Sequence, residues 1–105
     1  MNLFRKNHSQ FRLTFWGVRG SIAVPGREFA GIGGNTSCVE LRCGDTILVL
    51  DAGTGIRKLG MSLLKEFGNT PVDIRILISH THWDHIQGFP FLPHIYIPGH
   101  QITLY

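Results

Sequence analysis

Four side chains of the kinds that bind metal ions follow directly on an apolar run, and this segment constrains the fold more than any other. Residues 72–79 are apolar almost throughout, which predicts a central strand covered on both faces. The next six residues contain, in order, His80, His82, Asp84 and His85. In an extended chain the first two imidazoles lie on one side, because side chains two apart point the same way. The chain must then turn, so that the other two ligands come from a loop or from the first turn of a helix.

These four ligands exceed what one ion easily takes from so short a segment. The economical arrangement is two divalent metal ions about 3.5–4 Å apart that share a hydroxide, each completed by ligands from elsewhere in the chain. Such ions lower the pKa of bound water from about 15.7 to near 7, which provides a nucleophile at neutral pH. Nitrogen and oxygen ligands suit zinc, with manganese and iron as alternatives. The competing interpretation is a His-rich surface turn without function.

Around this cluster the sequence pattern predicts an α/β domain. Runs rich in β-forming residues predict further strands at residues 12–16, 37–42, 46–50 and 101–105. The tripeptide 43–45 is a short hairpin signal. Apolar residues at helical spacing predict an amphipathic helix over residues 55–67, which Gly60 weakens and Gly68 ends. The long loop over residues 17–35 is expected to border a functional site or else to be a plain surface connection.

Composition favours one packed globular domain, because 43% of the 105 residues are hydrophobic. We expect residues 1–10 to be a polar N-terminal extension. Neither a secretory signal nor a membrane span is visible, so a soluble cytoplasmic protein is expected. The formal net charge of +3 suits an anionic substrate, but the basic residues are scattered and support a nucleic-acid partner only weakly. If Cys38 and Cys43 share one strand, their odd separation places them on opposite faces, and we expect both to be reduced.

The segment His80-Thr81-His82-Trp83-Asp84-His85 resembles the His-x-His-x-Asp-His signature of the metallo-beta-lactamase fold. Residues 15–21, 33–38 and 50–55 resemble the branch of that family related to phosphodiesterases and tRNA 3′-processing nucleases. The resemblance runs from about Phe11 to Pro98 and implies an αββα sandwich of two sheets between helices. It specifies the superfamily strongly and the substrate poorly.

The resemblance also implies roles for individual residues. His80 and His82 would bind the first metal, and Asp84 and His85 the second. Asp84 would also orient the nucleophilic water, which makes it the candidate catalytic residue. Asp51 matches an aspartate at a strand end that braces the ligand loop by hydrogen bonds, although it is also explained as an ordinary turn residue.

Other side chains have weaker claims to a role in the site. We expect Trp83 to serve packing rather than chemistry. His8, His94 and His100 lack neighbouring ligand types and are interpreted as surface or loop histidines. Arg19 would meet an anionic substrate or else be a solvated loop arginine.

The family completes its metal site with two later histidines and an aspartate that bridges the metals, and none of these has a place in this sequence. We therefore expect residues 11–105 to be the N-terminal half of a truncated domain that binds metal weakly and turns over little or no substrate. The parent protein is expected to hydrolyse a small-molecule or nucleotide phosphodiester through the bridging hydroxide. The alternatives are a thioester or acyl hydrolase of the glyoxalase type and a non-catalytic metal-binding fragment, and the oligomeric state stays open.

Overall fold

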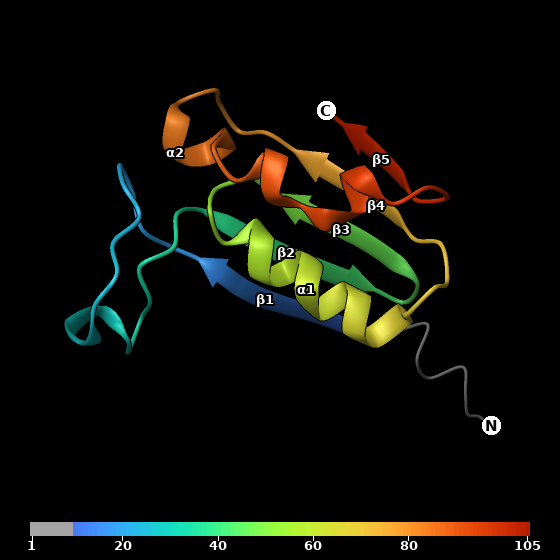
Figure 1. Ribbon diagram of the computed structural model, residues 1–105, viewed down its shortest axis with the longest axis horizontal. Coiled ribbons are helices and arrows are strands. Elements are labelled where there is room, and N and C mark those ends of the chain that lie inside the picture. Colours follow the sequence, from blue (N-terminus) through green and yellow to red (C-terminus); the bar gives the residue numbers. More distant parts are fainter. Residues whose placement is uncertain (1–9) are drawn as a thin grey trace.

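A computed structural model describes residues 10–105, which form one five-stranded sheet with helices on one of its faces (Figure 1). The strands lie in sequence order across the sheet: β1 (Phe11–Gly17), β2 (Cys38–Cys43), β3 (Thr46–Leu50), β4 (Asp73–Leu77) and β5 (Gln101–Leu104). The helices are α1 (Ile56–Phe67), α2 (Trp83–Ile86) and the short 3₁₀ helices η2 (Arg27–Phe29), η3 (Phe89–Phe91) and η4 (Pro93–Tyr96). The five predicted strands and the predicted long helix are confirmed to within two residues at each end.

The sheet changes from antiparallel to parallel at β3. The first three strands pair antiparallel, and Cys43 pairs with Thr46 across the tight turn between β2 and β3. Gly44 in this turn has a φ of 56°, a left-handed conformation that glycine adopts without a steric penalty. The hairpin predicted at residues 43–45 is therefore confirmed. Crossovers through α1 and then through α2, η3 and η4 make β3, β4 and β5 parallel, so their carboxyl ends lie at one edge of the sheet.

Helix α1 closes the core on one face of the sheet. Leu59 and Leu63 are at most 1% exposed and join a buried cluster with Ile74 and Ile76 of β4. Glycine lowers helix propensity at position 60, but close packing explains its presence there. A β-carbon at this position would lie 2.5 Å from the Pro93 side chain, so glycine lets η4 approach the helix closely.

The prediction that the strand after Val72 is covered on both faces is wrong for the described residues. Ile74 and Ile76 are fully buried, but Arg75 is exposed and Leu77 is 38% exposed on the opposite face. A helix lies over only one side of the sheet in this part of the chain (Figure 1). The open face of β4 carries Asp73 and Arg75 beside Leu77, so the run over residues 72–79 is less apolar on that face than its overall composition indicates.

The remaining expectations concern the terminus, the cysteines and membrane spans. The predicted extension lies outside the described residues except for Gln10, as does His8. Cys38 is buried and Cys43 is exposed on the same strand, and both are free, as predicted. Burial raises the pKa of the Cys38 thiol to about 12. Between Gln10 and Tyr105, no helix has the length and apolar character needed to cross a membrane.

Candidate metal centre

The four predicted ligands gather where the chain leaves β4 and turns into α2. His82 is extended and caps the helix, which begins at Trp83, so Asp84 and His85 stand in the first helical turn as predicted. The His80 ring centroid lies 4.6 Å from that of His82 and 4.1 Å from that of His85. Nε2 of His85 is 3.4 Å from Oδ2 of Asp84. One strand end and one helical turn thus place three imidazoles and a carboxylate side by side.

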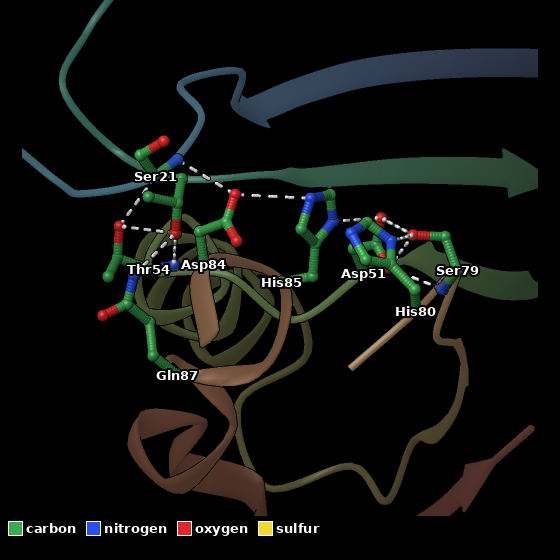
Figure 2. A network of polar contacts seen from close by, with 9 residues as sticks. Ser21, Asp51, Thr54, Ser79, His80, Asp84, His85 and Gln87 are labelled. Carbon is green, nitrogen blue, oxygen red and sulfur yellow. Dashed lines mark hydrogen bonds and ion pairs between the residues drawn. The ribbon is translucent and has the colours of Figure 1, made fainter. Parts of the chain in front are cut away.

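Asp51 links this cluster to the end of β3. Its Oδ1 accepts hydrogen bonds from the Ser79 backbone N–H at 2.7 Å and from the Ser79 hydroxyl at 2.9 Å. Its Oδ2 lies 2.9 Å from Nδ1 of His85, so that His85 stands between Asp51 and Asp84 (Figure 2). Asp51 has a φ of 67°, which is uncommon outside glycine and marks a backbone held by its surroundings.

The protonation states of these side chains follow from the same contacts. Burial raises the pKa of Asp51, but hydrogen bonds from Ser79 and His85 outweigh it and hold the pKa below its usual value. An ionised carboxylate only accepts hydrogen bonds, so His85 is the donor to Asp51 through Nδ1. With Nδ1 held by Asp51, Nε2 of His85 is the ring nitrogen left to bind a metal ion, the arrangement common to histidine ligands.

The long loop before β2 reaches the cluster through Asp84. The backbone N–H of Ser21 donates to Oδ2 of Asp84 at 3.0 Å, although 63 residues separate them in sequence (Figure 2). This hydrogen bond lowers the pKa of Asp84. Ser21 has a φ of 71°, a second left-handed residue at this edge of the site. The prediction that residues 17–35 border the site is therefore consistent with this direct contact to a candidate ligand.

A second network fixes α2 beside the sheet, and the sequence interpretation assigned it no role. The buried Thr36 hydroxyl accepts from the Thr54 backbone N–H at 2.8 Å and from Nε2 of Gln87 at 3.3 Å. The Thr54 hydroxyl in turn accepts from the Thr36 backbone N–H at 2.8 Å. A β-carbon on Gly53 would lie 2.6 Å from the Asp84 carbonyl oxygen, so the turn after Asp51 approaches the ligand helix closely. Thr36 and Gly53 lie in the segments that carry the family resemblance, which was the available signal.

The donors of the cluster fit a divalent metal in kind. Imidazole nitrogen and carboxylate oxygen suit zinc, iron or manganese, and Asp51 leaves Nε2 of His85 available. Within residues 10–105, however, no three His, Cys, Asp or Glu side chains converge in a geometry that would hold an ion. The cluster is therefore a partial ligand set, with donors of the right type and too few of them aimed at one point.

Three residues outside the cluster differ in part from expectation. The packing role expected for Trp83 is wrong for the described residues, because its side chain is 68% exposed. His94 is buried rather than at the surface, and its ring centroid lies 4.7 Å from that of His100. His100 is half-buried, and its Nδ1 accepts from the Val72 backbone N–H at 3.1 Å.

Comparison with known proteins places this geometry among known folds. The family model described as the metallo-beta-lactamase superfamily matches residues 31–102. Ribonuclease Z of Picrophilus torridus is 33% identical over 84 residues, which are 80% of this chain and 24% of that protein. A crystal structure of a Thermotoga maritima protein assigned to the metallo-beta-lactamases superposes with a TM-score of 0.52 at 22% identity, and the match covers 90% of this chain and 42% of that one. The chain therefore has part of that fold and spans less than half the length of either relative.

Proposed function

The chain belongs to the metallo-beta-lactamase superfamily, and on that basis we propose that it carries the first ligand cluster of a metal-dependent hydrolase that cleaves phosphodiester bonds. The observation that carries this proposal is the position of His85, with Nδ1 2.9 Å from Asp51 and Nε2 3.4 Å from Asp84. A histidine whose Nδ1 is held by one carboxylate and whose Nε2 faces a second candidate ligand, beside two further imidazoles, is arranged for metal binding rather than for packing. The similarity to a ribonuclease Z favours a phosphodiester over a thioester substrate.

In this proposal each residue has a separate task. His80 and His82 would hold one divalent ion, and Asp84 and His85 would hold the second, with zinc as the first candidate metal. Such a metal, when bound, lowers the pKa of coordinated water to about 7 and stabilises charge on phosphoryl oxygens. Asp51 fixes the tautomer and orientation of His85, and the Ser21 N–H keeps Asp84 ionised and in place.

Zinc titration of purified 1–105 followed by NMR of the imidazole groups tests the ligand assignment. We expect weak binding that shifts the signals of His80, His82 and His85, because the donors form a partial set. The Asp84→Ala variant should weaken zinc binding about tenfold or more, because removing even a side chain that only supports a metal ligand costs about that much affinity. His100→Gln removes a histidine outside the cluster and should leave zinc affinity unchanged. Equal zinc affinity in all three proteins would contradict the assignment.

The substrate class is tested with bis-nitrophenyl phosphate against a thioester. We expect turnover by 1–105 to be very slow, to depend on added metal and to be lost in Asp84→Ala. A metal-dependent preference for the thioester would favour the acyl hydrolase alternative instead. Bound zinc without turnover of either substrate would leave the chain as a metal-binding fragment.

A further inference from the structure

A cavity of about 590 Å³ lies in the long loop between β1 and β2, on the side where this loop contacts Asp84. We call it the loop cavity; its walls include Val18, Arg19, Ser21, Glu28, Phe29 and Ile32. The metal cluster does not use these side chains. Ser21 belongs to both regions, because it lines the loop cavity and its backbone N–H donates to Asp84. The loop cavity and the ligand cluster are therefore joined through one residue.

Arg19 is the one cationic side chain in the cavity wall, and the structure holds it in place. Its Nε donates to the Ile22 carbonyl oxygen at 2.8 Å, and its guanidinium carbon lies 5.2 Å from the centre of the Phe29 ring. The terminal Nη1 and Nη2 groups keep four N–H donors. Among residues 10–105, no carboxylate forms an ion pair with Arg19. A fixed guanidinium with free donors in a fork is suited to a phosphate group.

The rest of the cavity wall favours an organic phosphate over a bare anion. Val18 and Ile32 are 48% and 84% exposed, so apolar surface lies beside the charge. Glu28 also lines the cavity and would repel an anion, although its carboxylate lies back against Gly26. A sugar or a base has the apolar surface that covers Val18 and Ile32, while its phosphate reaches Arg19.

We propose that the loop cavity binds a second phosphate of an oligonucleotide, adjacent to the phosphodiester at the ligand cluster, with Arg19 as the phosphate-binding residue. This inference rests on the proposed phosphodiester hydrolase. It narrows the substrate from any small phosphodiester to an oligonucleotide with at least two phosphate groups. It also assigns the substrate specificity to Arg19, a residue outside the metal centre.

Binding of two dinucleotides to metal-free 1–105 tests the proposal. The probes are pApA, which has a 5′-terminal phosphate, and ApA, which lacks it, and affinity is read from the NMR shifts of loop-cavity amides such as Ser21 and Ile32. We expect pApA to bind about tenfold more tightly than ApA, the order expected for a charge-assisted Arg–phosphate contact. Arg19→Gln should abolish this preference. The exposed Arg57 on α1 is the matched control, and Arg57→Gln should retain it.

A second variant, Glu28→Gln, and a second ligand, inorganic phosphate, test the same site independently. If Arg19→Gln disturbs the loop, Glu28→Gln still tests it, because removing the nearby negative charge should tighten pApA binding two- to threefold, on the order of a partly exposed charge pair. Equal affinity for pApA and ApA in the unaltered chain would overturn the inference. Inorganic phosphate that binds as tightly as pApA would overturn its nucleotide part and leave only a general anion site.

The two proposals can fail separately. Zinc binding at the histidine cluster together with equal affinity for the two dinucleotides would retain the hydrolase and remove the phosphate subsite. An Arg19-dependent preference for pApA in a chain whose histidine signals ignore zinc would retain the phosphate site and contradict the hydrolase.

Discussion

The two faces of the sheet are built from the same strands, yet only one of them is closed. On the α1 face, Ile47, Val49, Ile74 and Ile76 are at most 3% exposed. The cross-strand register places a different set of side chains on the other face, and most of them are also apolar: Phe11, Leu13, Phe15, Val39, Leu41, Leu48, Leu50 and Leu77. Phe11 and Phe15 are 63% and 64% exposed.

This difference shows what the strand sequences are suited to. A sheet with one wet face normally carries polar residues on that face. Here β1, β2 and β3 place mostly apolar side chains on the open face. An exposed apolar surface of this extent is uncommon on a monomer and indicates that something packs against it. The solved Thermotoga maritima structure, of which this chain covers 42%, has more than twice the matched length. We therefore expect burial of both faces to stabilise the fold, but within the described residues only the α1 face is buried.

The largest expected effect separates two adjacent residues of β4. Ile76 is fully buried and Leu77 is 38% exposed on the opposite face. Ile76→Ala should lower the free energy of unfolding by about 2–5 kcal/mol, because it leaves a cavity in a closed core. Leu77→Ala should cost about 1 kcal/mol, because the leucine is already partly in water. Urea denaturation of both variants measures the difference. An equal loss would show that the open face is covered in solution.

A smaller effect is expected on association. The wild-type chain should self-associate as its concentration rises, because the open face exposes Phe11 and Phe15. Replacing both with aspartate should weaken association about tenfold or more, since two charges must then be desolvated at the contact. Sedimentation velocity over a concentration series measures this. Met61→Asp is the control, because Met61 is 53% exposed on α1, away from the open face. Equal weakening by the control would assign the association to another surface.

Local patterns predicted the elements well, and tertiary contacts explain what they missed. The spacing of Leu59 and Leu63 defines α1, and four ligands within six residues must lie near one another whatever the fold. The hydrogen bond from Ser21 to Asp84 joins residues 63 apart, and no periodicity encodes it. The pairing of Thr36 with Thr54 likewise depends on two turns that meet only in the folded chain.

The open face and the exposed Trp83 illustrate a second limit of sequence analysis. An apolar residue pattern predicts that a surface will be covered, but not by which part of a protein. The interpretation of residues 72–79 as covered on both faces is wrong for the described residues, because Asp73, Arg75 and Leu77 face the open side. Trp83, which lies between the ligands, was expected to serve packing rather than chemistry and is largely exposed.

The smallest expected effect concerns the pH dependence of stability and arises from His94, a buried titratable residue on the α1 side of the sheet. His94 in η4 is 2% exposed, and its Nδ1 has no hydrogen-bond partner among the described residues. Burial, and secondarily the nearby His100, lower the pKa of His94 below its ordinary value of about 6.5. As the pH falls below about 6.5, the unfolded chain takes up a proton that folded His94 does not, so stability decreases until the lower folded pKa is reached.

The variant His94→Gln should remove this part of the pH dependence. Between pH 7 and 5, the wild-type free energy of unfolding should fall more steeply than that of the variant. Urea denaturation at several pH values, taken as the difference between the two proteins, cancels contributions from the histidine cluster. Asp51 does not interfere, because a lowered carboxyl pKa affects stability only near and below its ordinary value of about 3.9. If the difference between the two proteins does not change with pH, His94 is hydrated in solution. The α1 side of the sheet would then be less closed than its buried residues indicate.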